Sequence, residues 1–170
     1  MIYFTSDLHL GHRGIIEMQN RPFENVEEMN RVLIDNYNEL VHKNDTVYFL
    51  GDISHHMPID RVNELLSMMK GKKILIKGNH DIKDNNSYRM SGFTEVYELP
   101  VILDGFWIMS QEPMYVNENM PYANVFGHVH NNPMYRTVSS QSYCVSVERI
   151  GYTPILFVDV KRAVQEYHDE

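Results

Sequence analysis

Short apolar runs divide the first half of the chain into alternating strands and helices. Residues 2–6, 46–50 and 73–77 are rich in apolar and β-branched side chains and are followed by Gly, Asp or Asn, as buried strands commonly are. Between them, residues 25–41 and 58–69 carry apolar positions at helical spacing, which predicts two amphipathic helices. Two strand-helix-strand units predict parallel pairing in this half.

The second half changes to strands separated by short turns. The predicted strands are residues 95–99, 101–109 with a turn at Asp104-Gly105, 124–126, 142–147 and 155–158, because each is a short apolar run bounded by turn residues. We expect a second, mixed or antiparallel sheet and a terminal helix over residues 159–167. Residues 83–91 and 116–122 are expected to be surface loops. The whole organisation predicts one domain over residues 1–170, with two packed sheets and helices outside.

Composition and charge exclude several classes of protein. No apolar run approaches the roughly 20 residues needed to cross a bilayer, so no membrane span is expected among these 170 residues. The net charge of -8 without a basic cluster disfavours long nucleic acids and anionic lipid as partners. The N-terminus shows no signal segment, which predicts a cytoplasmic protein. Cys144 is the single cysteine, so no internal disulfide can form.

Side chains suited to metal binding follow the predicted strands. They are Asp7 and His9, then Gly51-Asp52, then Gly78-Asn79-His80-Asp81, and finally Gly127-His128-Val129-His130. Taken singly, an Asp in such a place is usually a turn or helix cap and a His is usually structural. Together they place carboxylate, imidazole and amide groups where parallel strands bring their carboxyl ends together. Mixed oxygen and nitrogen donors suit manganese, iron, nickel or zinc.

These motifs, in this order, resemble the calcineurin-like metallophosphoesterase family. Its pattern of Asp-x-His, Gly-Asp, Gly-Asn-His-Asp and Gly-His-x-His spans residues 7–130 here. The resemblance implies an α/β fold, a four-layer α/β/β/α sandwich of two mixed sheets flanked by helices, in agreement with the two sheets predicted above. It also implies a metal-dependent phosphodiesterase or phosphomonoesterase that uses a metal-activated water.

The resemblance further implies a centre of two divalent ions that share one carboxylate. Manganese is the expected metal, with iron, nickel, zinc or magnesium as alternatives. The ligands implied are Asp7, His9 and His130 for the first ion, Asp52 as the bridge, and Asn79 and His128 for the second ion. Two ions held in this way would bind phosphoryl oxygens and activate water.

Catalytic and substrate-binding roles are also implied near these ligands. By the resemblance, His80 donates a proton to the leaving oxygen or steadies the pentavalent phosphorus, and Asp81 orients its ring. A purely structural hydrogen bond is the alternative for His80. Asn79, His80 and His12 are expected to contact the substrate. Arg13 would contact a phosphoryl oxygen, and the alternative for it is a solvated loop at the start of a helix.

One position departs from the family pattern. Where the family usually has Ser-His-x-Pro, this chain reads Ser110-Gln111-Glu112-Pro113, and an amide oxygen binds iron, nickel or zinc less well than imidazole does. The second site would then favour manganese or magnesium, fill only with substrate, or be lost in a binding or scaffold protein on the same fold. Glu112 could instead supply a carboxylate. We expect Gln111 to be a weak ligand and activity to be retained, because the other ligand positions are intact.

The expected substrate is a small phosphate ester or nucleotide. A nuclease acting on strand ends and a hydrolase of non-phosphate esters are the alternatives, since metal centre and fold do not fix the substrate. His55 and His56 follow Asp52 closely enough to flank a substrate channel, although exposed loop histidines are commoner. Arg21-Pro22-Phe23 is expected to be a structural entry to the helix over residues 25–41.

Overall fold

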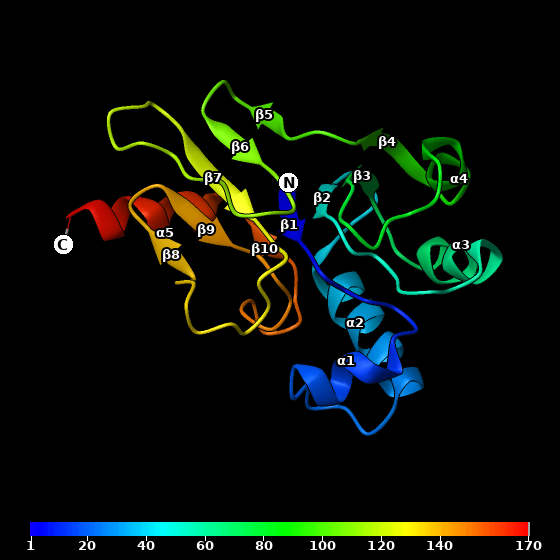
Figure 1. The fold of residues 1–170 in the computed structure, drawn as a ribbon. Coiled ribbons are helices and arrows are strands. Elements are labelled where there is room, and N and C mark those ends of the chain that lie inside the picture. Colours follow the sequence, from blue (N-terminus) through cyan, green and yellow to red (C-terminus); the bar gives the residue numbers. More distant parts are fainter. Residues whose placement is uncertain (170) are drawn as a thin grey trace.

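The computed structural model describes residues 1–169 as two five-stranded sheets with helices packed against them (Figure 1). The first sheet has the order β10-β1-β2-β3-β4. Its strands are β1 (Ile2–Thr5), β2 (Thr46–Leu50), β3 (Lys72–Ile76), β4 (Phe93–Tyr97) and β10 (Ile155–Leu156). All neighbours are parallel except β10, which pairs antiparallel with β1.

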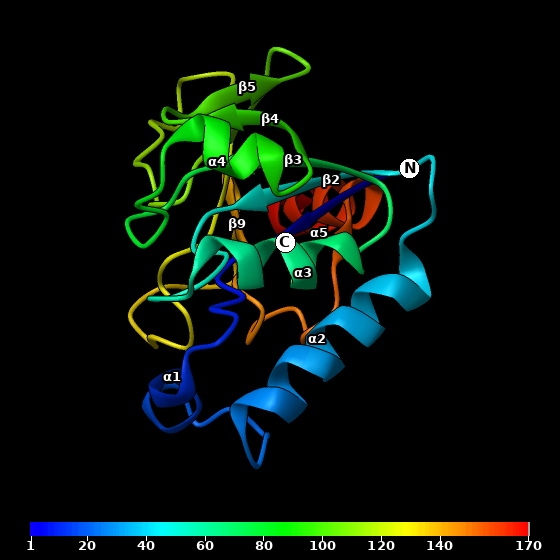
Figure 2. The ribbon, with the colours of Figure 1, turned by 90° about the vertical axis from the view of Figure 1, so that its right-hand side faces the viewer.

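Four helices follow the strands of the first sheet, and the longest of them runs beneath it in Figure 2. They are α1 (Arg13–Met18), α2 (Val26–Leu40), α3 (Ile59–Ser67) and α4 (Asn85–Met90). Asn25 caps α2 by accepting a hydrogen bond from the Glu28 backbone N–H at 2.8 Å, which satisfies one unpaired donor of the first turn. The apolar faces of α2 and α3 share one buried cluster with β2 and β3.

The second sheet has the order β5-β6-β7-β9-β8. Its strands are β5 (Val101–Leu103), β6 (Trp107–Met109), β7 (Ala123–Phe126), β8 (Val138–Ser139) and β9 (Ser142–Cys144). The three central strands are parallel, and both edge strands run antiparallel to their neighbours. Both sheets are therefore mixed.

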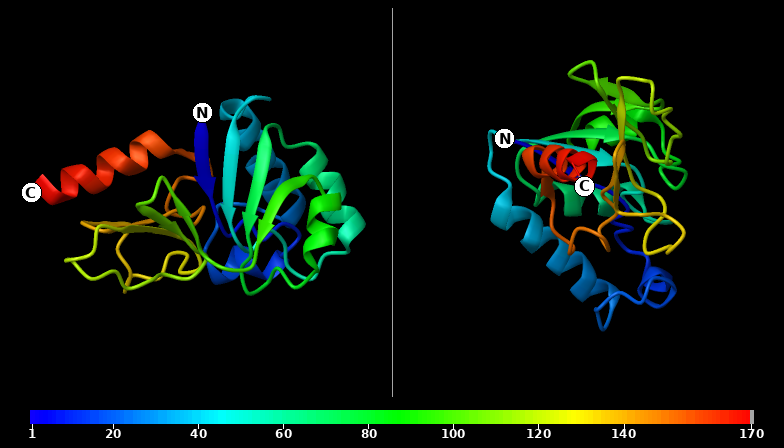
Figure 3. Two further views of the ribbon diagram at one scale, coloured as in Figure 1. Left: turned by 90° about the horizontal axis from the view of Figure 1, so that it is seen from above. Right: turned by 90° about the vertical axis from the view of Figure 1, so that its left-hand side faces the viewer.

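A second apolar cluster joins the two sheets and α5 (Phe157–Asp169), which contacts β8 and β9 as well as β1 and β10 (Figure 3). The ring of Phe157 lies edge-on to Phe4 of the first sheet at 5.3 Å and to Trp107 of the second at 5.5 Å. Edge-to-face aromatic pairs add to the stabilisation from apolar burial. The facing sheets and the terminal helix thus form one interior.

This architecture confirms the predicted fold class, two mixed sheets with flanking helices, and the parallel pairing of the first half. Several predictions about the second half are wrong, among them the strand over residues 142–147, which ends at Cys144. Residues 93–97 join the first sheet, parallel to β3, because α4 supplies the crossover between them. The strand predicted over residues 155–158 belongs to the first sheet, antiparallel to β1, and ends at Leu156. Phe157 begins the helix, which turns its ring into the cluster between the sheets.

The stretch over residues 83–91, predicted as a loop, contains α4. Its helix forms because the side chain of Asp84 accepts hydrogen bonds from the backbone N–H groups of Asn86 and Ser87, a strong N-cap. Only Tyr88 of this helix is buried, so the periodic apolar pattern that indicates a helix is missing.

Among residues 1–169, no helix combines the length and apolar composition that crossing a membrane requires.

We predict that Phe49→Ala lowers the free energy of unfolding by about 3–5 kcal/mol. The Phe49 side chain is fully buried, stacks on Tyr37 and meets Phe93 edge-on, so truncation leaves a cavity. Urea denaturation followed by circular dichroism measures the change. Leu99→Ala is the control, because Leu99 is 75% exposed and its loss should stay within about 0.5 kcal/mol. Equal losses in the two variants would contradict this description of the core.

Candidate metal centre

Polar side chains gather at the carboxyl ends of the parallel strands of both sheets. Each predicted ligand or catalytic residue follows one of these strands by a few positions: Asp7 and His9 follow β1, Asp52 follows β2, Asn79, His80 and Asp81 follow β3, Gln111 follows β6, and His128 and His130 follow β7. A parallel bridge between Ser6 and Ser146 brings the two sheets together at this rim. The topology therefore places a ligand site where open α/β sheets commonly have one.

The backbone of this rim is held in an uncommon conformation. Five residues have positive φ without being glycine: Asp7 (60°), His9 (50°), Asp52 (55°), His128 (70°) and His130 (47°). Such conformations cost of order 1–3 kcal/mol each and cluster at functional sites. Cross-loop hydrogen bonds fix them, since the N–H groups of Asp7 and His9 donate to the carbonyls of Gly51 and Asp52, each at 3.0 Å.

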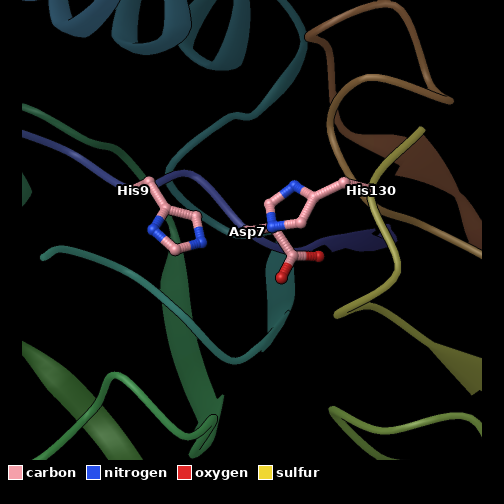
Figure 4. Close-up of side chains that lie close together, drawn as sticks. All are labelled: Asp7, His9 and His130. Carbon is pink, nitrogen blue, oxygen red and sulfur yellow. The ribbon is translucent and has the colours of Figure 1, made fainter. Parts of the chain in front are cut away.

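Asp7, His9 and His130 form the first group that could hold a divalent ion. One potential ligand atom from each lies within 4.8 Å of the other two, and Figure 4 shows the His130 ring above the Asp7 carboxylate and the His9 ring to the left of it. Asp7 is fully buried, and its Oδ2 accepts hydrogen bonds from the His128 N–H at 2.9 Å and the Ser146 hydroxyl at 2.8 Å. Within residues 1–169, the buried Nε2 of His9 has no hydrogen-bond partner.

A buried ion pair that sequence reasoning missed orients this group. The Arg21 guanidinium donates to Glu148 Oε1 at 2.7 and 2.9 Å and to the carbonyls of Asp7 and Leu8 at 2.7 and 2.9 Å. Glu148 Oε1 also lies 2.9 Å from His130 Nδ1. A carboxylate on one ring nitrogen fixes the tautomer and leaves the other nitrogen free for a metal. Arg21 therefore helps to orient the metal-binding group, a role beyond the structural entry to helix α2 that its sequence context predicts.

Asp52 and Asp81 are two further buried carboxylates at the site. Asp52 Oδ2 lies 3.6 Å from His9 Nε2, and its Oδ1 accepts a hydrogen bond from the His80 N–H at 2.9 Å. Asp81 accepts bonds from the backbone N–H groups of Asp52, Gly78 and Ile53 at 2.7, 2.9 and 3.1 Å. Among the described residues, the His80 ring donates no hydrogen bond to Asp81, whose carboxylate instead holds the backbone of the Asp52 loop. The expected role of Asp81 in orienting the His80 ring stays a prediction.

Burial sets the electrostatics of this group. It raises the pKa of Asp7, raises that of Asp52 to about 7 and that of Asp81 to about 6. Burial, followed by the charges of His130 and Arg21, lowers the pKa of His9 to about 2. Burial also lowers the pKa of His130, but the hydrogen bond to Glu148 and the charge of Asp7 outweigh it and raise the value overall.

A divalent cation would stabilise the ionised form of the buried carboxylates and would bind the free lone pair of a neutral imidazole. The unpartnered Nε2 of His9, in the part of the chain that the structure describes, offers such a lone pair. The residues present therefore fit a divalent ion.

The residues expected to bind the second ion are less closely gathered. A second group of potential ligand atoms consists of His9, Asp52 and His80. Asn79 and His128 have exposed side chains, and His128 contacts Asp7 through its backbone N–H. His128 belongs to no group of the described His, Cys, Asp and Glu side chains that could hold a metal. Gln111 is buried and contacts both carboxylates, with its Nε2 3.1 Å from Asp7 Oδ1 and 3.3 Å from Asp52 Oδ2.

Further histidines line the approach to the centre. The rings of His12 and His55 stack at 3.9 Å, His55 lies 4.7 Å from His80, and His56 lies 4.2 Å from His55. His12 also lies close to His9, with their Nδ1 atoms 3.4 Å apart. The structure thus brings His12 to the site.

Arg13 lies elsewhere, in an exposed position. It lines a depression with Ile16, Glu17, Glu24 and Glu27, and none of the predicted ligands borders that depression. Its expected contact with a phosphoryl oxygen remains a prediction that this placement does not favour. Glu112 projects into no metal-binding group of the described residues.

Comparisons with known proteins agree with this arrangement. A family model described as calcineurin-like phosphoesterase matches residues 1–156. Uncharacterized protein MJ1445 of Methanocaldococcus jannaschii is 36% identical over 159 residues, which cover 91% of this chain and 85% of that protein. A crystal structure of AQ665, a protein of unknown function from Aquifex aeolicus, has a TM-score of 0.71 and 26% identity, covering 95% of this chain and 98% of that one.

The crystal structure of Pseudomonas putida nuclease MPE is similar in fold. It has a TM-score of 0.53 and 20% identity, and the similarity covers 76% of this chain and 61% of that one.

We predict that Glu148→Ala weakens Mn²⁺ binding by about 10–100-fold and lowers the free energy of unfolding by about 3–5 kcal/mol. It leaves His130 without its acceptor and the buried Arg21 without its partner. Isothermal titration calorimetry and urea denaturation measure the two effects. Glu148→Gln keeps an acceptor oxygen and should recover most of the affinity.

The control for this prediction is Glu98→Ala. Glu98 pairs with Lys77 at 3.4 Å on the surface, where an ion pair contributes about 0–1 kcal/mol. If Glu148→Ala bound Mn²⁺ as tightly as the Glu98→Ala control, Glu148 would not position His130.

Proposed function

Because the chain belongs to the calcineurin-like phosphoesterase family, we propose that it is a divalent-metal-dependent enzyme that hydrolyses small phosphate esters or nucleotides by direct attack of water. The observation that carries this proposal is the group of Asp7, His9 and His130, whose ligand atoms lie within 4.8 Å of one another at the rim where both sheets end. Manganese is the proposed metal, and iron, nickel, zinc and magnesium are the alternatives that oxygen and nitrogen donors also bind.

The first ion would be held by Asp7, His9 and His130, with the Asp52 carboxylate beside them. A divalent ion in such a site polarises phosphoryl oxygens and lowers the pKa of water. Ser146 and the His128 N–H orient the Asp7 carboxylate, and the His80 N–H orients Asp52. These contacts fix both carboxylates before substrate arrives, which is the geometric condition for efficient catalysis.

His80 is the proposed proton donor to the leaving oxygen. Its ring lies 5.2 Å from that of His9, so it borders the ion without being needed in the first ligand group. It also lines a cavity of about 300 Å³ together with Ser54, His56, Met57 and Lys83. A leaving group in that cavity would meet the imidazole directly, as general acid catalysis requires.

The shape and charge of the site favour small substrates. A second cavity of about 590 Å³ is lined by His128, His130, Asn131 and Tyr135. These volumes suit small molecules, and the net charge of -8 opposes long nucleic acids. Nucleotides and other small phosphate esters are therefore the proposed substrates.

The activity test uses purified protein loaded with Mn²⁺ and two activated aryl substrates, bis(4-nitrophenyl) phosphate and 4-nitrophenyl phosphate. We expect release of nitrophenolate from at least one of them, abolished by EDTA and inhibited by inorganic phosphate. A parallel assay with 4-nitrophenyl acetate should show no metal-dependent turnover. Absence of phosphoester hydrolysis, with turnover gained in Gln111→His, would instead support a binding or scaffold protein whose centre is weakened by Gln111.

We predict that substitution of Asp52 weakens metal binding, whereas substitution of His80 slows turnover. Asp52→Asn removes a buried negative charge beside His9 and should weaken Mn²⁺ binding by more than about 100-fold, the upper end for loss of an outer contact. His80→Ala should keep metal content near wild type and lower kcat by about 10²–10⁴-fold, the usual contribution of general acid catalysis. Metal analysis and kinetics on both proteins separate the roles.

The matched control is His168→Ala, because His168 is exposed on α5 and should change neither quantity. If His80→Ala lost its metal and Asp52→Asn kept it, His80 and not Asp52 would be the residue needed for metal binding. That result would contradict the proposed mechanism.

A further inference from the structure

Gln111 is held at the centre by two glycines. A Cβ atom on Gly51 would lie 2.2 Å from Gln111 Cγ, and one on Gly78 would lie 2.8 Å from it. Both distances are far inside van der Waals contact, so the chain needs glycine at both positions to seat the Gln111 stem. The Gln111 side chain is only 1% exposed. With its stem fixed in this way, only the terminal amide can turn.

The amide bridges two buried carboxylates through its nitrogen. Gln111 Nε2 donates to Asp7 Oδ1 at 3.1 Å and to Asp52 Oδ2 at 3.3 Å, which uses both of its protons. Asp7 and Asp52 are 0% and 2% exposed, so each needs a donor to remain charged. An amide oxygen facing the same carboxylates would be repelled by both, and electrostatics therefore assigns the nitrogen to this side.

The oxygen atom at the other end of the Gln111 amide accepts no hydrogen bond from the described residues. Among residues 1–169, the buried Gln111 Oε1 has no hydrogen-bond partner. To bind an ion between the carboxylates, Gln111 would have to turn over, breaking both charge-assisted hydrogen bonds and moving its N–H₂ to the unpartnered position. A histidine in the same place would offer a ring lone pair without this loss. The amide therefore opposes a second ion instead of attracting it.

The first ligand group does not depend on Gln111. The ligand atoms of Asp7, His9 and His130 lie within 4.8 Å of one another without it. The side chains of Asn79 and His128, the other expected ligands of the second ion, are exposed. The other group of described ligand atoms, His9, Asp52 and His80, shares His9 with the first group, so the two groups do not supply separate ligand sets for two ions.

We propose that Gln111 is a hydrogen-bond bridge between Asp7 and Asp52 and not a metal ligand, so that the centre holds one tightly bound divalent ion, at Asp7, His9 and His130. This inference rests on the proposed function, because it requires a metal centre. It goes beyond that function by assigning the number of tightly bound ions and a structural role for the amide.

The first test counts ions. Wild-type protein, Gln111→Leu and Gln111→His are stripped with EDTA, reloaded with excess Mn²⁺, passed through a desalting column and analysed for metal. We expect one ion per chain to be retained by the wild type and by Gln111→Leu, because the wild-type amide presents its N–H₂ group to the two carboxylates and leucine has no ligand atom. Gln111→His should retain a second ion.

The second test measures thermal unfolding, which needs no activity. Without metal, Gln111→Leu should have a lower Tm than the wild type, because both carboxylates lose their shared donor. Saturating Mn²⁺ should narrow the difference, since the ion then pairs with the carboxylates. Gln165→Leu, a substitution at an exposed position of α5, is the control and should leave both Tm values unchanged.

The outcomes separate the two proposals. Two tightly bound ions in the wild type, one of which is lost in Gln111→Leu, would make Gln111 a ligand and overturn the inference while leaving the proposed function intact. Two ions in wild type would overturn it even if Gln111→Leu failed to fold. Absence of any bound ion in the wild type would overturn the proposed function, and the inference with it.

Discussion

The close burial of two carboxylates, Asp7 and Asp52, is the constraint on which the rest of the site depends. Two negative charges near each other and shielded from water are unfavourable unless donors or a cation stabilise them. The chain surrounds Asp7 with the Ser146 hydroxyl, the His128 N–H and the Gln111 amide. Since these donors follow different strands, the requirement to satisfy one carboxylate also fixes how the two sheets meet.

Backbone conformation serves the same requirement. The residues that carry the site adopt left-handed conformations that are unfavourable for them, and they are held by hydrogen bonds between neighbouring loops. The two apolar clusters on either side of the first sheet supply the stability that maintains this strain. Fold and site are therefore linked energetically: the interior keeps the rim in a geometry that the rim alone would not adopt.

Sequence patterns predict the framework well where local signals coincide with tertiary structure. Strand β2 and helix α2 follow from apolar periodicity, and the residues of the rim follow from their positions after strands. The patterns fail where the determining contact is remote or is made to the backbone. Arg21 and Glu148 are 127 positions apart, and no local signal pairs them. Asp81 contacts backbone N–H groups, which sequence does not display, and α4 forms from a cap without apolar periodicity.

The contact of Arg21 with Glu148 has a consequence for the order of events during synthesis. The two residues are 127 positions apart in the sequence, and the Arg21 guanidinium also donates to the carbonyls of Asp7 and Leu8. During translation, the N-terminal strands and their helices emerge long before residue 148 does. The His130 imidazole gains its orienting carboxylate only after Glu148 leaves the ribosome, so a nascent chain reaches its full affinity for an ion only once residue 148 has emerged.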